Sequence, residues 1–193
     1  MGFSSQSVAD FCDTVAAETS APGGGSVAAV AGGMAAALAA MAARFSKEQW
    51  EDAGGAVAQA EALKARLLPL AEEDARAYEN VLLALRMPKE LDAEVRDAAI
   101  GDALSRAADV PMAIAEAAAD VATLATELAE RGNPNLRGDA AAAALLAEAA
   151  VRTSANLVEI NLATREGDER LERARELVEI VRRTARRALQ PAP

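Results

Sequence analysis

The sequence predicts an all-α protein, a single-domain bundle of about six helices over residues 1–193. Roughly a quarter of the residues are Ala, the strongest helix former, and β-branched residues are sparse. Hydrophobic residues make up 52% of the chain but aromatic residues only 3%, so the core must be built from small side chains. Closely packed helices satisfy both observations, whereas a β-sandwich or a disordered chain does not.

The first two helices are separated by the strongest helix breaker in the chain, Ala-Pro-Gly-Gly-Gly-Ser at residues 21–26. We expect Ser5 or Ser7 to cap the first helix, which runs to about Glu18 and carries apolar residues at helical spacing. The second helix is expected over residues 26–45.

An uncharged run over residues 19–43 is long enough to raise the question of a membrane span. The run consists mostly of Ala and Gly, whereas membrane-spanning helices are richer in Leu, Ile and Phe. We therefore expect a helix that is buried on most sides inside a soluble bundle, with no membrane partner.

Prolines delimit the next two helices. The third is expected over residues 56–87, and Pro69 should kink it or divide it in two. The fourth is expected over residues 89–130, interrupted at Pro111. Both expectations follow from the missing N–H group of proline, which removes one bond from the hydrogen-bond ladder of a helix.

Two further turns delimit the last helices. Arg-Gly-Asn-Pro-Asn at residues 131–135 stops the fourth helix, and the fifth begins near Asp139. Glu-Gly-Asp at residues 166–168 forms the next turn, and the last helix runs to about Leu189. Its end is rich in Arg, which suits the negative end of the helix dipole and needs no nucleic acid to explain it.

Charge and composition exclude several classes of function. The net charge is −10, so no overall positive field attracts nucleic acid. One Cys and no His exclude a disulfide framework, a Cys/His zinc site and a Ser-His-Asp triad. Proton transfer must therefore use a carboxylate, a Lys, the Tyr, the Cys or water. No secretory signal is visible in the sequence, so we expect a cytoplasmic protein.

The glycine-rich loop Pro22-Gly23-Gly24-Gly25-Ser26 is the first candidate binding site. Glycines let backbone N–H groups approach a ligand, and the start of the following helix adds positive potential and unpaired donors. Such a loop can hold a carboxylate, a phosphate or the polar edge of a heterocycle. The alternative interpretation is a tight turn between helices with Ser26 as the cap.

Asp74 is the candidate general acid or base. It follows Glu72 and Glu73 on a predicted helix, lies between small residues, and shares a helix face with Tyr78 one turn later. A carboxylate in a partly apolar cleft has a raised pKa, which suits it to general acid-base catalysis. The alternative is a solvated acidic face, which we prefer for Glu72 and Glu73.

Further polar candidates lie in the second half of the chain. Asp139 follows an Asn-rich loop and either caps the fifth helix or forms part of a polar pocket wall. Asn156 and Asn161 lie among apolar residues, where they satisfy each other or the backbone, or bind the polar atoms of a ligand ring. Lys47 is a candidate for holding an acidic group, although a solvated helix end explains it equally well.

The order of these motifs resembles the cyclodeaminase/cyclohydrolase family, which includes the C-terminal domain of formiminotransferase-cyclodeaminase and stand-alone methenyltetrahydrofolate cyclohydrolases. The resemblance covers roughly residues 5–187. It rests on Pro-Gly-Gly-Gly-Ser before an Ala/Gly-rich helix, Glu-Asp-Ala-x-Ala-Tyr at residues 73–78, a mid-helix Val-Pro, and an Asn-rich loop closed by Asp before an Ala run. It implies a helical homodimer that binds a tetrahydrofolate derivative, with no metal and no cofactor beyond that substrate.

The resemblance also implies an activity, the hydrolysis of 5,10-methenyltetrahydrofolate to 10-formyltetrahydrofolate. Asp74 would act as general base and then acid, and Asp139 would order the water or the pterin edge. Asn156, Asn161 and the glycine loop would hold polar atoms of the substrate, and Lys47 its glutamate tail. The alternatives are a formiminotetrahydrofolate cyclodeaminase that releases ammonia, a catalytically silent folate-binding bundle, or a purely structural bundle.

Overall fold

The computed structural model describes residues 2–163, 165 and 167–190, which form seven α-helices and two short 3-10 helices and contain no strand. The predicted all-α class is therefore confirmed. One more helix is present than the sequence predicts, because the expected third helix is divided in two. The α-helices are α1 (Val8–Ala16), α2 (Gly24–Arg44), α3 (Ala53–Leu67), α4 (Leu70–Leu85), α5 (Ala93–Arg131), α6 (Arg137–Asn161) and α7 (Glu169–Leu189), and the 3-10 helices are η1 (Phe3–Ser5) and η2 (Pro134–Leu136).

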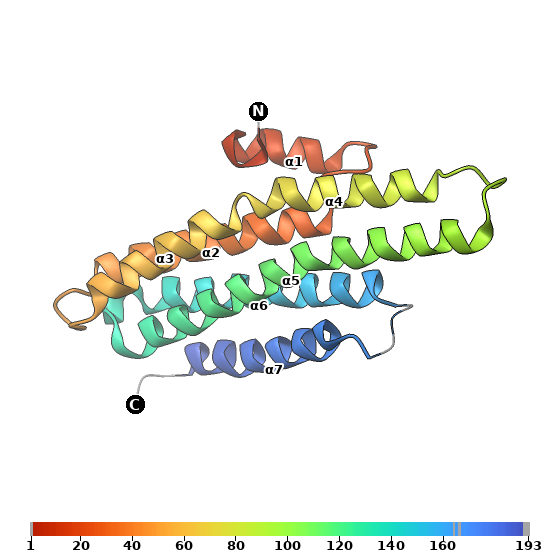
Figure 1. Cartoon of the computed structure of the whole chain (residues 1–193). Helices are drawn as coiled ribbons and strands as arrows, with labels where there is room; N and C mark the ends of the chain where they lie inside the picture. The colour runs from red at the N-terminus through yellow and green to blue at the C-terminus, as the bar shows by residue number, and fades with distance from the viewer. Residues whose placement is uncertain (1, 164, 166, 191–193) are drawn as a thin grey trace.

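The long helices lie side by side in a bundle, with α5 and α6 paired through its middle (Figure 1). Helix α2 packs against α3, α5 and α6, while α7 covers the other side of the α5 and α6 pair. Helix α4 continues the direction of α3 and packs against α5 and α2. This arrangement brings the start of α2, the middle of α4 and α5, and the end of α6 to one region of the bundle.

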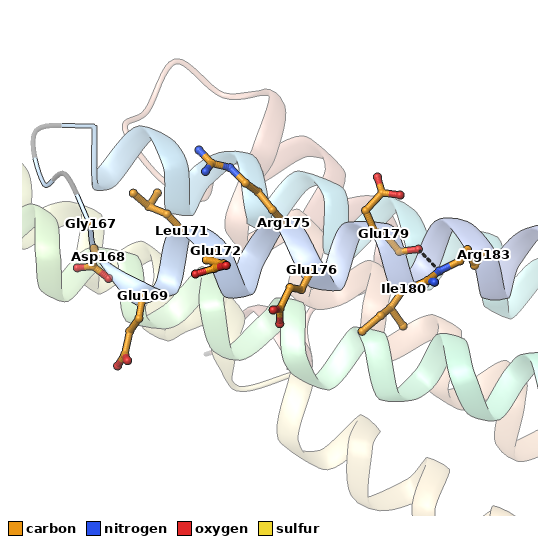
Figure 2. Close-up of a pocket in the computed structure, with 10 residues that line it drawn as sticks. All are labelled: Gly167, Asp168, Glu169, Leu171, Glu172, Arg175, Glu176, Glu179, Ile180 and Arg183. Carbon is orange, nitrogen blue, oxygen red and sulfur yellow. Dashed lines mark hydrogen bonds between the residues drawn. The ribbon is translucent and has the colours of Figure 1, made fainter.

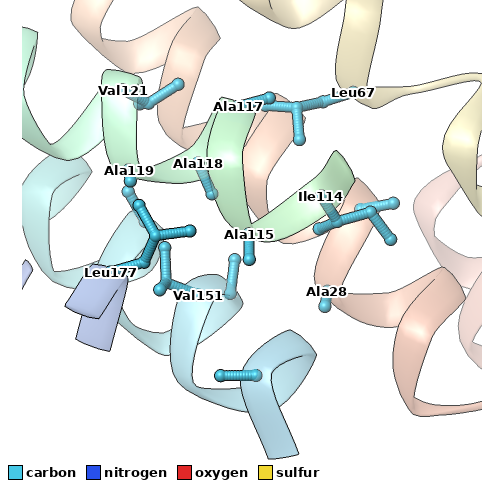
Figure 3. Packing of buried hydrophobic residues seen from close by; sticks show 14 of the residues in the cluster. Ala28, Leu67, Ile114, Ala115, Ala117, Ala118, Ala119, Val121, Val151 and Leu177 are labelled. Atoms are coloured by element: carbon cyan, nitrogen blue, oxygen red, sulfur yellow. The ribbon is translucent and has the colours of Figure 1, made fainter. Parts of the chain in front are cut away.

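The core consists mostly of Ala, with a few larger side chains between the helices (Figure 3). Leu67 of α3, Ile114 of α5 and Val151 of α6 are fully buried and fill the spaces that the Ala residues leave. Helix α2 approaches its neighbours so closely that a Cβ atom added at Gly33 would lie 2.6 Å from Cδ2 of Leu68. Small residues therefore set the spacing of the bundle.

Helix α2 is the uncharged segment that raised the question of a membrane span. It is long and apolar enough to cross a membrane, but 61% of its most apolar stretch is buried inside the bundle. Twelve of its 21 residues are buried, nearly all of them Ala or Gly. The helix is therefore packed as the core helix that the sequence predicts.

Capping residues define several helix ends. Ser7 caps α1, because its Oγ accepts a hydrogen bond from the backbone N–H of Asp10 at 3.1 Å, as expected for one of the two predicted caps. Asp168 caps α7 by accepting from the backbone N–H of Arg170 at 3.0 Å. The predicted turn at residues 166–168 includes Glu166, which lies outside the described residues.

The two prolines that the sequence places inside helices affect those helices differently. Pro69 divides the expected third helix into α3 and α4, as predicted. The expected interruption at Pro111 is wrong, because α5 runs through this residue without a break. The missing N–H of Pro111 leaves the carbonyl of Ala107 without its helical donor. Asn161 of α6 supplies one instead, with its Nδ2 at 3.1 Å from that carbonyl oxygen.

Candidate functional site

A pocket of about 300 Å³ lies where the start of α2 meets α4, α5 and α6. Four separate helices contribute to it, so the tertiary fold and not a local motif creates it. Its walls combine backbone, a carboxylate, a phenol and an amide with small apolar side chains. The lining residues are Ser20, Ala21, Gly23, Gly24, Gly25, Asp74, Ala75, Tyr78, Ala107, Leu157, Ile160 and Asn161.

Asp74 is half-buried and is held beside the first turn of α2 by Ser26. The Oγ of Ser26 lies 3.1 Å from Oδ2 of Asp74 and 2.8 Å from the backbone carbonyl oxygen of Ala71. A hydroxyl group has one proton to donate, so an ionised Asp74 competes with this carbonyl for it. A protonated Asp74 instead donates to Ser26 Oγ while Ser26 donates to Ala71, and both hydrogen bonds form together.

The pKa of Asp74 also favours the protonated form of this carboxyl. Burial raises the pKa of this carboxyl above its ordinary value, since burial disfavours the charged form. Hydrogen bonds from the Ser26 side chain and the Ser26 backbone oppose the shift but do not cancel it. Asp74 therefore has the raised pKa that the sequence predicts for a carboxylate in a partly apolar cleft, which suits it to accepting and returning a proton.

Gly25 makes the close approach of α2 to Asp74 possible. A Cβ atom added at Gly25 would overlap Oδ1 of Asp74, whereas one added at Gly24 meets nothing within 4 Å. The glycine-rich loop thus has two different roles. Gly25 leaves room for the carboxylate, and Gly24 leaves open space in the pocket.

The first turn of α2 lies beside the pocket and the Asp74 carboxylate. The cap residue is Gly23, which has no side chain to accept from these N–H groups. The expectation that Ser26 caps the helix is wrong, because α2 begins two residues earlier and Ser26 is buried inside its first turn. The positive end of the helix dipole therefore lies beside the carboxylate of Asp74 and next to the pocket.

Tyr78 and Asn161 complete the polar part of the pocket. Tyr78 lies one turn after Asp74 on α4, as the spacing predicts, and its side chain is 46% exposed. Asn161 is the last residue of α6 and is half-buried, with its amide donating to Ala107 of α5. The expected contact with a backbone group is therefore present, and because Asn161 also lines the pocket, its contact with a ligand stays a prediction.

Two other predicted site residues lie outside this pocket. Asn156 is exposed and lines a separate groove between α6 and α7, so the expectation of a buried Asn156 beside Asn161 is wrong. Five residues turn a helix well past one revolution, which places the two Asn side chains on different faces of α6. Pro22 lies between the lining residues Ala21 and Gly23 but itself lines a neighbouring hollow between α1, α2 and α6.

Asp139 and Lys47 lie at the opposite end of the bundle. Asp139 is in the first turn of α6, roughly 33 Å along the helix from Asn161 at about 1.5 Å per residue. Lys47 follows the C-terminus of α2, roughly 30 Å from the glycine-rich start. Within one chain, both residues therefore lie far from the pocket that holds Asp74. Asp139 is not the helix cap either, because α6 already begins at Arg137.

A larger hollow of about 770 Å³ runs along α7 (Figure 2). It is lined by α7 and the turn before it, and it contains none of the predicted site residues. Its charged side chains follow one another along a single helix instead of converging on a point, as the labelled sticks show. The smaller pocket is therefore the candidate functional site. The charged residues of this hollow are Asp168, Glu169, Glu172, Arg175, Glu176, Glu179 and Arg183.

Sequence reasoning missed the apolar wall of the pocket, which Ala107, Leu157 and Ile160 form. Leu157 lies one turn before Asn161 on the same face of α6, and Ile160 directly precedes Asn161 in the chain, so the position of Asn161 could have indicated both. Ala107 carries no such signal, because it is one of many Ala residues in α5. Among the described residues, no three His, Cys, Asp or Glu side chains come together as metal ligands.

These features define a class of protein, a helical bundle with a carboxylate pocket for a small polar ligand. A family model described as formiminotransferase-cyclodeaminase matches residues 7–179. The chain belongs to this family. The resemblance seen in the order of the motifs is thereby confirmed.

Relatives of known activity cover most of the chain. Methenyltetrahydrofolate cyclohydrolase of Methylorubrum extorquens is 34% identical over 164 residues, which span 81% of this chain and 79% of that protein. Formimidoyltransferase-cyclodeaminase of Sus scrofa is 36% identical over 160 residues, or 79% of this chain and 30% of that longer protein. The crystal structure of formiminotetrahydrofolate cyclodeaminase from Thermotoga maritima superposes with a TM-score of 0.82 at 30% identity, covering 95% and 94% of the two chains.

Proposed function

We propose that this protein is a methenyltetrahydrofolate cyclohydrolase, which hydrolyses 5,10-methenyltetrahydrofolate to 10-formyltetrahydrofolate without a metal. The observation that carries the proposal is the half-buried Asp74 carboxylate in its pocket, in a chain 34% identical to a cyclohydrolase over most of both lengths. We further propose that it acts as a cytoplasmic homodimer of single-domain subunits.

The charge of the pocket suits the substrate. The methenyl bridge joins N5 and N10 of the folate and carries a delocalised positive charge. Asp74 is the charged side chain among the described lining residues, which include no Lys or Arg. An anionic carboxylate in a partly buried site stabilises a cation more strongly than it would in water. The anionic glutamate tail, by contrast, finds no cationic partner in this pocket and extends out of it.

Asp74 supplies the proton transfers that hydrolysis requires. Water attacks the carbon between N5 and N10 while the Asp74 carboxylate takes one of its protons. The bond from this carbon to N5 then breaks, and Asp74 returns the proton to N5. The remaining hydroxyl proton leaves for solvent as the formyl C=O forms. The cationic substrate and water thus give the neutral formyl product and one proton.

A cyclodeaminase is the second candidate, favoured by the Thermotoga maritima structure that matches 95% of this chain. In that reaction N10 attacks the formimino carbon on N5 and ammonia leaves. The same carboxylate would accept the proton of N10 and protonate the leaving nitrogen. The two reactions therefore need the same pocket and are separated by the substrate that is turned over.

The direct test mixes the purified protein with 5,10-methenyltetrahydrofolate and follows the loss of the methenyl chromophore against the uncatalysed rate. Fast hydrolysis that depends on the protein establishes the cyclohydrolase. Ammonia release from 5-formiminotetrahydrofolate, without accelerated hydrolysis of the methenyl substrate, establishes the cyclodeaminase instead. Binding of tetrahydrofolate without either reaction identifies a silent relative, and absence of binding identifies a structural bundle.

The raised pKa of Asp74 predicts the pH dependence of the reaction. A general base acts in its ionised form, so kcat/KM falls as the pH drops through the pKa of Asp74, at a midpoint above the ordinary value of 3.8. The native protein binds this proton more tightly than the unfolded chain does. The contribution of Asp74 to the free energy of unfolding therefore decreases as the pH rises through the same window. A pH–rate profile combined with thermal melts checks both trends, and an acidic limb at or below 3.8 contradicts the assignment.

A further inference from the structure

A hydrogen bond joins the end of α6 to the middle of α5, and its acceptor is a backbone carbonyl that a proline leaves free. In an uninterrupted helix the N–H of residue 111 would bond to the carbonyl of Ala107. Pro111 has no N–H group, so this carbonyl is free. The Nδ2 atom of Asn161 donates to it at 3.1 Å, and both Ala107 and Asn161 line the pocket that holds Asp74.

This bond determines how the Asn161 amide is presented to a ligand. An amide group is planar, and its oxygen and nitrogen point along different branches. With Nδ2 held by the Ala107 carbonyl, Oδ1 occupies the other branch of the amide. Oδ1 accepts no hydrogen bond from the residues that the structure describes, and it is not among the buried polar atoms without a partner. The oxygen is therefore an accessible acceptor with a fixed orientation at the pocket wall.

We propose that Pro111 is a positioning residue for substrate recognition. By freeing the Ala107 carbonyl, it orients Asn161 so that Oδ1 accepts a hydrogen bond from an N–H donor of the reduced pterin ring. The inference rests on the proposed function, because the reduced pterin is the part of the substrate that is rich in N–H groups. An amide turned the other way would present its own N–H groups to these donors and would lose the bond.

Pro111→Ala and Asn161→Ala test the proposal, singly and together. The Ala variant at position 111 restores the helical N–H donor, so Asn161 must share the Ala107 carbonyl oxygen with it and its bond is weakened. Ala is well tolerated inside a helix. Each single variant is expected to raise KM, and the Kd for tetrahydrofolate, by roughly 3- to 10-fold, the effect of one neutral hydrogen bond. The kcat should stay close to wild type, since Asp74 and its partners are untouched. In the double variant the two effects should not multiply, because they remove the same contact.

Asn80→Ala is the matched control, since it removes an exposed amide from α4 outside the pocket. It should change neither KM nor Kd. If Pro111→Ala still changes KM in the Asn161→Ala background, the positioning role is overturned. Wild-type affinity in Asn161→Ala alone overturns it as well. This second result can be obtained even if Pro111→Ala does not fold. A wild-type protein that binds no tetrahydrofolate overturns the proposed function and this inference together. Binding that is insensitive to Asn161 overturns the inference alone.

Discussion

Asp74→Asn is expected to lower kcat by roughly 10²- to 10⁴-fold, the range for loss of a general acid-base group. The amide keeps the size and shape of the side chain but can neither accept nor return the proton. The Kd for tetrahydrofolate should change little, because this ligand lacks the cationic bridge that Asp74 stabilises. Stopped-flow loss of the methenyl chromophore and titration with tetrahydrofolate measure the two quantities separately.

The same variant should unfold at a higher temperature than the wild type at neutral pH. Burial raises the pKa of Asp74, so the ionised carboxylate costs stability in the native state and its neutral isostere does not. Glu73→Gln is the matched control, since it removes an equal charge from the exposed neighbouring position. Turnover near the wild-type rate in Asp74→Asn would remove this residue from the mechanism, and an equal loss in Glu73→Gln would show that charge alone matters.

Gly25→Ala should lower kcat/KM by roughly 10²-fold, because a single methyl group displaces the carboxylate that we propose as the general base. The added Cβ would overlap Oδ1 of Asp74, so either the Asp74 side chain or the start of α2 must move. The hydrogen bond between Ser26 and Asp74 would be lost or distorted with it. Overpacking of this kind costs about 1–3 kcal/mol of stability. Steady-state kinetics and chemical denaturation measure the two effects.

Gly24→Ala is the matched substitution at the neighbouring residue, where an added Cβ meets nothing within 4 Å. The added methyl group enters open space without touching Asp74, so kcat should stay close to wild type and any effect should fall on KM. If Gly25→Ala retained full activity, the close approach of α2 to the carboxylate would have no functional role. If both variants lost kcat alike, the loss would come from the loop backbone and not from displacement of Asp74.

Local patterns explain why part of the site could be predicted from the sequence. Asp74 and Tyr78 are one helical turn apart, and that spacing places them on one face wherever the helix packs. The glycine-rich segment breaks any helix and starts the next, so its position at the start of α2 follows from composition. Ser7 caps α1 through a bond to a residue three positions later. Each of these relations spans fewer than six residues.

The wrong predictions share one cause. In each, contacts or distances between residues far apart in the sequence decide the structure, and a rule based on neighbouring residues does not include them. Pro111 does not interrupt α5, and Asn161, 50 positions later, donates to the carbonyl that proline leaves free. Ser26 is not a cap, because its hydroxyl is committed to Ala71 and Asp74 in another helix. The resemblance implies that Asp139 orders the water or the pterin edge, but within one chain Asp139 and Asp74 lie at opposite ends of the bundle. Sequence order carries no information about such distances.

The sequence by itself determined that this protein is helical, where most of its helices begin and end, and which carboxylate suits proton transfer. Helix propensity, apolar spacing and breakers act over a few residues, and each can be read along the chain. Only the tertiary structure decided that α2, α4, α5 and α6 enclose a pocket around Asp74 and that Asp139, Lys47 and Asn156 lie outside it. The physical reason is that burial, which raises the pKa of Asp74 and shapes the pocket, depends on how helices far apart in sequence pack together.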